Sequence, residues 1–509
     1  MKVNTDKVVL GPFLDLDGFM NVCRAGATVE FSEEYVERVS AARALVEQWA
    51  AEERVMYGVT TGFGSLCTKA ISSEETAQLQ HNILESHSVS VGQPLPVEAV
   101  RGIMLMVLQN VGQGHSGVRI EILEMYREFL NRGITPWVPG DGSVGYLSPE
   151  AHIARVIEGN GKVWYQGALE DASEALAKVG MQPRPLSSKE GLALVSGTTS
   201  PTAFAAIAVY DMINAAKAAD VIGALSLENL RGTLRAFDDR ICLVRPHSEQ
   251  AQSASTVRRM LVDSRIVQES QRLQDALSLR AIPQLHGAAK KTLYDAKQTV
   301  ETEINACSDN PVIWTRAGEE DIISCCNCDA AYVGIEMDSA AVAAANLAKM
   351  SERRNSRLID GSISGFPDFM VANPGLNSGL MIPQYAQAGL LNEIRVLSSP
   401  ATIDNTPTCN MQEDYVSMGY NACRKAMAIA QKLEYILAIE LLADYQATCF
   451  TEDWPQRASA SRAVYEEIGR SLPLIHEDTF IHGYIEHLKA YIHTGAIIDT
   501  VSGLIGELK

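Results

Sequence analysis

Long apolar stripes with a helical repeat run through this chain, and few segments show the alternation of a strand. One stripe follows Ser32, a suitable N-cap, and consists of Tyr35, Val39, Ala42, Val46 and Trp49. Another consists of Ile429, Leu433, Ile436, Leu437 and Leu441. The segment "GIEMDSAAVAAANLAKMSERR" is rich in alanine and free of proline. These patterns predict a mainly α protein built as a bundle of long helices.

The sequence also predicts where one helix ends, how the chain assembles and how it divides into domains. The segment "LHGAAKKTLYDAKQTVETEINACSDNP" predicts a helix that ends at Asn310–Pro311. Long helices often bury more apolar surface than one chain can cover, which predicts a homo-oligomer. We expect an N-terminal active-site domain over residues 1–200 and a central and C-terminal long-helix bundle over 201–509.

Composition narrows the possible partners. The chain has 509 residues, an apolar fraction of 46% and a formal net charge of −19. An acidic chain is a poor ligand for nucleic acid or an anionic membrane, and no apolar run approaches the roughly 20 residues of a membrane span. The start "MKVNTDKVVLGPFLDLDGF" lacks the pattern of a signal peptide, so we expect a soluble cytoplasmic protein.

Ten cysteines are scattered along the chain, and "CCNC", Cys325 to Cys328, is their one cluster. Cys325 and Cys328 have the first half of a zinc-site spacing, but no second pair matches it. We therefore predict free thiols and no metal site.

Glycine-rich loops interrupt the helical segments, and such loops on a helical scaffold are where binding sites are usually built. They read "YGVTTGFGS", "GDGSVGYLSPE", "LVSGTTS", "SGFPDFMVANPGLNSG" and "DNTPTCNMQEDYVSMG". None has the spacing of a Walker or Rossmann phosphate loop.

In this order the loops and their flanks resemble the histidine and phenylalanine ammonia-lyase superfamily. The specific motifs include "YGVTTGFG", "LQHNILESHSVSVG", "KEGLALVSGT", "NACSDNP", "SERRNSRL" and "NSGLMIPQ". The resemblance implies an α-helical homotetramer whose active sites are shared between subunits. It also implies elimination of an amine from histidine or an aromatic amino acid.

Family members build an electrophilic ring, methylideneimidazolone, from an Ala-Ser-Gly tripeptide that follows "GSVG". Here "GSVG" is followed by Tyr146, Leu147, Ser148 and Pro149, so the tripeptide is missing. Ring closure needs the backbone nitrogen of a glycine, whereas the nitrogen of Pro149 has no hydrogen. Val195-Ser196-Gly197 looks like a second such tripeptide, but its context matches a motif in which Ser196 replaces an asparagine. The gap predicts a member without the prosthetic group and without any other cofactor.

Other family positions are kept. Tyr57 matches the base that removes the β-proton, and Arg280 matches the arginine that binds the substrate carboxylate through a guanidinium fork. Gln274 and Asn310 match polar residues of the same pocket. Each has an ordinary alternative role, such as a loop contact, a salt bridge or a capped helix end.

Two positions concern the substrate ring. Glu413, in "MQEDYVSMG", follows the version of the motif typical of histidine lyases, and a glutamate can accept an imidazole N–H. His87 lies where the family selects its ring, and a histidine there favours a polar one. Together they indicate an imidazole substrate.

The positions around the missing electrophile change together. Ser196 replaces an asparagine, Leu277 replaces a tyrosine, and Cys328-Asp329 replaces a phenylalanine-histidine pair. Leu277 would give methyl groups an apolar contact, and Asp329 or Tyr146 would face a cation. Coordinated change beside a retained base indicates a remodelled leaving-group pocket.

A trimethylammonium group is permanently cationic and leaves as neutral trimethylamine, so its departure needs no electrophilic ring. The chain therefore resembles ergothionase-like members of the superfamily, and Tyr57, Arg280 and Glu413 are its expected catalytic residues. The expected substrate is a histidine betaine, with ergothioneine giving thiourocanate or hercynine giving urocanate. The alternatives are a histidine-type ammonia lyase with an unusual electrophile and a non-catalytic homologue.

Overall fold

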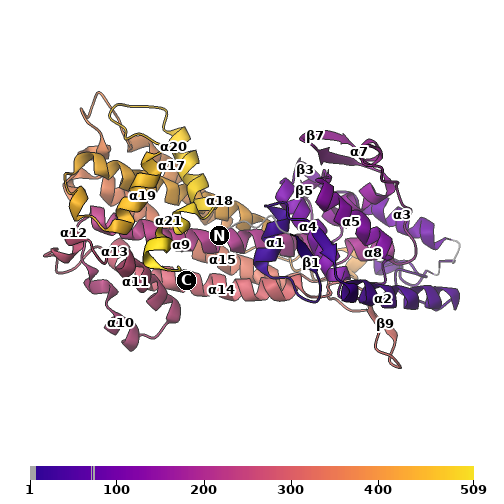
Figure 1. Ribbon diagram of the computed structural model, residues 1–509. Coiled ribbons are helices and arrows are strands. Elements are labelled where there is room, and N and C mark those ends of the chain that lie inside the picture. The colour runs from indigo at the N-terminus through magenta and orange to yellow at the C-terminus, as the bar shows by residue number, and fades with distance from the viewer. Residues whose placement is uncertain (1–6, 70, 73–74) are drawn as a thin grey trace.

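Four long helices form the centre of the molecule. The computed structural model describes residues 7–69, 71–72 and 75–509. The four helices are α9 (Thr199–Asn229), α14 (Ile282–Ile304), α15 (Ala331–Ile359) and α18 (Gly419–Ala447). They pack against one another and connect two thicker ends of the molecule (Figure 1). This confirms the expected mainly helical bundle.

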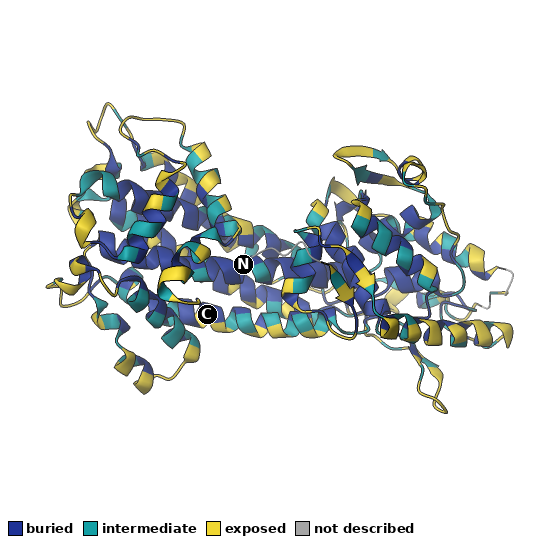
Figure 2. Ribbon diagram, viewed as in Figure 1, coloured by how far each residue is buried: buried dark blue, intermediate teal, exposed yellow. Residues whose placement is uncertain are grey.

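The buried faces of these helices follow the apolar stripes. The five residues of the predicted stripe on α18 are all buried, and so are the five on α2 (Glu33–Ala51). Ser32 caps α2 as expected, because its hydroxyl accepts a hydrogen bond of 3.2 Å from the Tyr35 N–H. Nearly every residue of α9 is buried, and its many alanines let neighbouring helices approach closely. Figure 2 shows this buried core continuing along the long helices.

The remaining helices lie at the two ends. In Figure 1 the first group is indigo and purple, on the right, and the second lies on the left. The first group is α1 (Leu16–Cys23), α2, α3 (Thr76–His87), α4 (Val97–Val111), α5 (Ile120–Arg132), α6 (Ser148–Ala154), α7 (Ala172–Lys178) and α8 (Glu190–Val195). The second group is α10 (Asp239–Val244), α11 (Ser248–Met260), α12 (Arg265–Gln268), α13 (Leu277–Arg280), α16 (Gly361–Ser364), α17 (Met381–Leu397), α19 (Ser459–Gly469), α20 (His482–His493) and α21 (Ala496–Ile505).

Short strands support loops rather than form a core. β1 (Val8–Leu10) pairs in parallel with β2 (Val29–Phe31), and β3 (Val91–Pro94) pairs antiparallel with β5 (Pro139–Asp141). A three-stranded sheet has the order β4 (Thr135–Pro136), β6 (Lys162–Tyr165) and β7 (Ala168–Asp171). β8 (Val312–Trp314) pairs with β9 (Asp321–Ile323).

The helix expected to end at Asn310–Pro311 ends earlier, at Ile304. The side chain of the next residue, Asn305, binds elsewhere: its Oδ1 accepts from the Leu14 N–H at 2.7 Å and from the Gln109 amide at 2.9 Å. These tertiary bonds turn the chain out of the helix. The following loop therefore reaches the functional region as irregular backbone.

One helical stretch among the described residues, Glu190–Asn229, has the length and hydropathy of a membrane span. All of its most apolar window is buried inside the protein, as in the central helix of a folded core.

Candidate active site

A cavity of about 610 Å³ lies among the loops at one end of the long helices. Its walls come from segments far apart in the sequence, which include residues 57–66, 142–148, 192–196, 310–328 and 408–413. Seven of the expected site residues line it: Tyr57, His87, Tyr146, Ser196, Asn310, Cys328 and Glu413. Among the lining residues that the structure describes, Glu413 is the only carboxylate and none is lysine or arginine. The cavity of a single chain thus favours a cationic group.

Tyr57 lies in this cavity with its phenolic oxygen held by the backbone. The Gly64 N–H donates a hydrogen bond of 2.8 Å to that oxygen. Burial raises the pKa of Tyr57, and the Gly64 hydrogen bond opposes the rise while the charge of Glu413 adds to it. Gly64 has φ +55°, and a Cβ there would meet the Cys409 sulfur at 2.6 Å. A glycine is therefore required for this donor to reach Tyr57.

Glu413 keeps one carboxylate oxygen available. Its Oε2 accepts hydrogen bonds from the Tyr146 hydroxyl at 3.1 Å and from the Thr408 hydroxyl at 3.0 Å. No described residue donates to Oε1. Burial and the nearby Glu413 charge raise the pKa of Tyr146, so its hydroxyl stays a donor. Glu413 is oriented for a further N–H donor inside the cavity.

His87 ends α3 and presents a neutral ring. Burial lowers its pKa, and the Ser86 hydroxyl lies 3.0 Å from Nδ1. The imidazole is tilted against the Phe63 ring with 5.3 Å between centroids. A neutral imidazole beside a phenyl ring suits a flat, polar aromatic group.

Ser196 and Asn310 join two walls of the cavity. Ser196 follows the last turn of α8, and its hydroxyl accepts a hydrogen bond of 3.2 Å from the Asn310 N–H. The Asn310 side-chain oxygen in turn accepts from the Cys325 N–H at 2.9 Å. The loop beyond α14 is thereby fixed against α8.

The segment that replaces the cyclising tripeptide cannot form a methylideneimidazolone ring. Leu147 has φ +79°, and its N–H donates a hydrogen bond of 3.0 Å to the Val195 carbonyl. Ser148 begins α6 with Pro149 in the first turn, and its hydroxyl is 2.7 Å from that of Ser90. Residues 146–149 do not fit the prosthetic group, because Pro149 has no N–H with which to close the ring.

Three expected site residues lie elsewhere in the single chain. Gln274, Leu277 and Arg280 line a separate pocket of about 450 Å³ beside α13, at the other end of the long helices (Figure 1). Leu277 is 65% exposed. The Nε of Arg280 is buried without a hydrogen-bond partner among the described residues. A guanidinium in this state is ready to bind an anion.

Asp329 does not line the cavity either. Its carboxylate accepts a hydrogen bond of 2.9 Å from the Ala331 N–H at the start of α15. Asp329 precedes Ala330, the N-cap residue of α15, and its carboxylate satisfies one free N–H of the first turn.

Thiols form a part of the cavity that the sequence did not indicate as functional. Cys325, Cys326 and Cys409 line it beside Cys328. The Cys409 sulfur accepts a hydrogen bond of 3.3 Å from the Ser65 N–H, next to the donor to Tyr57. Burial raises the pKa of both Cys326 and Cys328, so these two thiols stay protonated. The "CCNC" cluster was the only sequence pattern that pointed to these thiols, and by itself it did not indicate a function.

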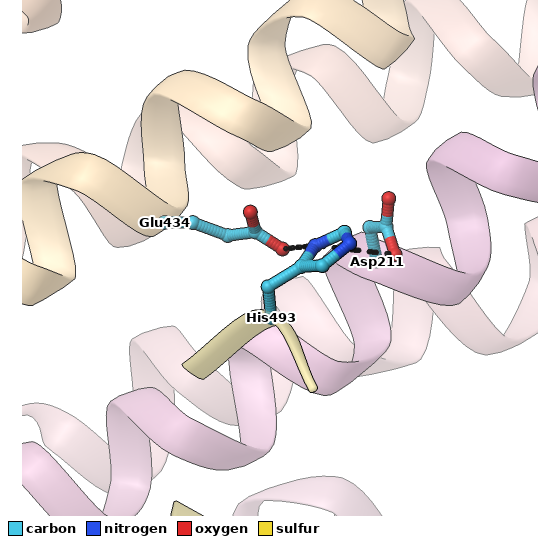
Figure 3. Close-up of side chains that lie close together, drawn as sticks. All are labelled: Asp211, Glu434 and His493. Carbon is cyan, nitrogen blue, oxygen red and sulfur yellow. Dashed lines mark hydrogen bonds and ion pairs between the residues drawn. The ribbon is translucent and has the colours of Figure 1, made fainter. Parts of the chain in front are cut away.

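A group of potential metal ligands lies outside this cavity. Asp211, Glu434 and His493 converge from α9, α18 and α20 (Figure 3). Cations already neutralise the carboxylates, because Arg24 pairs with Asp211 at 2.6 Å and Lys489 pairs with Glu434 at 3.1 Å. This arrangement is a buried ion-pair network rather than a metal centre.

Comparisons with known proteins agree with this architecture. The pattern of the family described as aromatic amino acid lyase matches residues 14–470. Histidine ammonia-lyase 1 of Fusobacterium nucleatum is 41% identical over the full length of both chains. The crystal structure of histidine ammonia-lyase from Trypanosoma cruzi is 33% identical, with a TM-score of 0.91 over 98% of this chain and 96% of that one. Ergothionase from Treponema denticola, described as an ergothioneine-degrading enzyme, is 27% identical, with a TM-score of 0.89 over 97% of this chain and 100% of that one.

Proposed function

The chain belongs to the aromatic amino acid lyase family, and on that premise we propose that it is a carbon–nitrogen lyase that eliminates trimethylamine from a histidine betaine. The substrate is ergothioneine, which gives thiourocanate, or hercynine, which gives urocanate. No methylideneimidazolone takes part in the reaction.

One observation carries this proposal. The cavity contains Tyr57, His87 and Glu413, while the backbone from Leu147 to Pro149 replaces the segment that would form the electrophile. An electrophilic ring assists a primary amine by bonding to its nitrogen. A trimethylammonium nitrogen has no lone pair to add to such a ring and leaves as a neutral amine without help. An enzyme that acts on a betaine is therefore expected to keep the base and to lack the ring.

The ring and the leaving group have separate partners in this proposal. The Oε1 oxygen of Glu413 accepts the imidazole N–H, and the neutral His87 ring packs beside it. The trimethylammonium group enters a cavity in which Glu413 carries the only formal charge among the described lining residues. Polarizable thiols and the Tyr146 ring lie along its walls. Attraction to the carboxylate and to the aromatic face favours a fixed cation there.

Tyr57 removes the β-proton in the chemical step. The electron pair of the breaking C–H bond forms the new C=C bond, and the pair of the C–N bond leaves with trimethylamine. Burial raises the pKa of Tyr57, which disfavours the phenolate. A bound trimethylammonium cation lowers that pKa by direct charge attraction, and the Gly64 N–H stabilises the phenolate further. The substrate thus helps to activate its own base.

The carboxylate of the substrate needs a cation that this cavity lacks. We propose that Arg280 of the partner subunit supplies it in a homotetramer whose active sites are shared between subunits. Two observations support this assembly. The Arg280 Nε is buried without a partner among the described residues. Exposed apolar residues also form one-sided stripes, which are Tyr332, Ile335 and Val342 on α15 and Ile382, Tyr385 and Val396 on α17.

A second candidate function has its own support. The Fusobacterium nucleatum relative is named histidine ammonia-lyase and is 41% identical over the whole chain. Deamination of histidine by this chain would require an electrophile other than a ring at residues 146–149. A non-catalytic homologue is the third candidate, and the kept Tyr57 and Glu413 weigh against it.

A substrate panel separates these candidates. The purified chain is incubated with ergothioneine, hercynine and histidine, and trimethylamine, ammonia and the absorbance of a urocanate-type product are measured. We expect trimethylamine and an unsaturated product from at least one betaine and no ammonia from histidine. Ammonia from histidine alone would establish the second candidate. No product from any of the three would overturn the proposal in favour of the non-catalytic homologue.

A further inference from the structure

A third cavity, of about 320 Å³, lies where α1, α14 and α21 meet α9. On α9 its lining residues include Tyr210, Ile213 and Lys217, which share one face because they are three or four positions apart. Ser196 borders the catalytic cavity just before α9 begins, and Lys217 follows 21 positions later. At ~1.5 Å per helical residue the two cavities are about 30 Å apart.

Lys217 is the unusual group in this third cavity. It is half-buried and has no hydrogen bond or ion pair with any described residue. Burial lowers its pKa, and the positive charge of Lys290 adds to the effect. Lys290, by contrast, is satisfied by the carboxylate of Asp220 at 2.5 Å. A half-buried ammonium without a directly bonded counter-ion loses more by desolvation than it gains from distant carboxylates.

The other walls offer apolar contact and neutral donors. Leu16, Ile213 and Ile498 provide aliphatic surface. Burial raises the pKa of both Tyr210 and Tyr294 to about 12, so each hydroxyl stays protonated near neutral pH. A protonated phenol can donate a hydrogen bond to an anion.

The remaining charges leave Lys217 as the anion-binding group. Lys297 lies 3.6 Å from the carboxylate of Glu301, which already neutralises it. Asp17 and Glu507 are both exposed to solvent, and their attraction only partly opposes the lowering of the Lys217 pKa. An anion of the right size would therefore gain an ion pair with Lys217 that no protein group provides.

We propose that this cavity is a second ligand site, which binds a small monocarboxylate with an aromatic or aliphatic body. The carboxylate pairs with the Lys217 ammonium and accepts hydrogen bonds from the tyrosine hydroxyls. The body of the ligand packs on Leu16, Ile213 and Ile498. The site is separate from the catalytic cavity and does not depend on the function proposed for that cavity.

Benzoate is a suitable probe, with benzamide as its uncharged counterpart. Binding to the full chain is measured by calorimetry for the native protein, for Lys217→Met and for Lys291→Met. Lys291 is an exposed residue of α14 outside the cavity and pairs with Asp295. Methionine keeps the apolar stem of lysine and removes the charge. We expect Lys217→Met to weaken benzoate binding about tenfold or more, while Lys291→Met leaves it unchanged.

Two outcomes would overturn the proposal. One is benzoate affinity that is the same in the native protein and in Lys217→Met. The other is benzamide binding as tightly as benzoate.

Chemical labelling gives a second measurement that does not depend on a variant. Because the pKa of Lys217 is lowered, it should react with an acetylating reagent faster than Lys291 near neutral pH. Mass spectrometry of the digested protein reports both rates. Benzoate should slow acetylation of Lys217 and leave that of Lys291 unchanged, and equal rates at Lys217 with and without benzoate would contradict the site.

Discussion

At the scale of single residues, the environment of Tyr57 makes the proposed base dependent on its substrate. The hydroxyl receives one backbone donor from Gly64 and lies near the negative Glu413, within a largely buried wall. Burial and the carboxylate favour the protonated phenol, while the Gly64 N–H favours the phenolate. The free enzyme therefore holds a weak base, and charge brought by the ligand decides its ionisation.

Replacing Tyr57 tests this role. Tyr57→Phe keeps the ring and removes the group that takes the proton, so we expect kcat for a betaine to fall by roughly 10²–10⁴-fold. Steady-state trimethylamine release measures the loss. Tyr146→Phe is the matched control, because it removes a hydroxyl from the same cavity that donates to Glu413, and its loss should be much smaller.

The same residue predicts a pH dependence with a definite sign. The reactive form is the phenolate, and the pKa of Tyr57 is raised, so kcat/KM should increase with pH across the neutral and mildly alkaline range. The residual activity of Tyr57→Phe should lack this increase. A native profile that falls as pH rises, or full activity in Tyr57→Phe, would exclude Tyr57 as the base.

At the scale of elements, charged groups buried between α9, α15 and α18 hold the long helices in register. The guanidinium of Arg354 on α15 pairs with both carboxylate oxygens of Glu440 on α18, at 2.5 and 2.9 Å. The Ser226 hydroxyl of α9 lies within hydrogen-bond distance of Glu440, at 2.7 Å, and of Asp444. Burial and the Glu440 charge raise the pKa of Asp444 well above its usual range. This network makes one arrangement of the three helices favourable.

Removing one member should destabilise the bundle. Arg354→Leu leaves the fully buried Glu440 without its cation, so the free energy of unfolding should fall by about 3–5 kcal/mol. A lower urea midpoint would report the change. Arg265→Leu on α12 is the control, because Arg265 and its partner Glu269 are both exposed, at 69% and 65%. We expect its effect to be under about 0.5 kcal/mol, and equal midpoints for the two variants would contradict the role of the network.

At the scale of the whole molecule, the expected site is divided between the two ends of the chain. Tyr57, His87 and Glu413 line one cavity, and Arg280 and Gln274 line another at the far end of the bundle. A substrate that spans a few ångströms cannot contact both groups in one chain. The proposed assembly resolves this separation because a partner subunit brings its α13 to the catalytic cavity.

Complementation between two inactive variants tests the shared site. Tyr57→Phe and Arg280→Ala chains carry different affinity tags, are co-expressed, and are purified through both tags in succession. If each site takes Tyr57 from one chain and Arg280 from another, random mixing should restore about a quarter of the native activity. Each variant alone should remain nearly inactive. Mixed oligomers with no recovered activity would show that both residues act within one chain.

Much of the fold could be predicted from the sequence because helical periodicity is a local property. The stripes that begin at Tyr35 and at Ile429 are buried as expected, and Ser32 caps its helix. The end of α14 could not be predicted this way. Asn305 leaves the helix to bind Leu14 and Gln109, which are distant in sequence. A local pattern contains no information about such partners.

By itself the sequence determined the helical class, the family motifs and the loss of the cyclising tripeptide, since each depends on residue types at fixed spacing. Only the tertiary structure decided which of those residues meet. It placed Cys325, Cys326 and Cys409 in the cavity that contains Tyr57, bonded Asp329 to the Ala331 N–H outside that cavity, and put Arg280 at the opposite end from Glu413. It also left Lys217 half-buried without a direct ion pair among the described residues. The physical reason is that cavities and desolvated charges arise where distant segments pack, and packing depends on three-dimensional neighbours rather than on order along the chain.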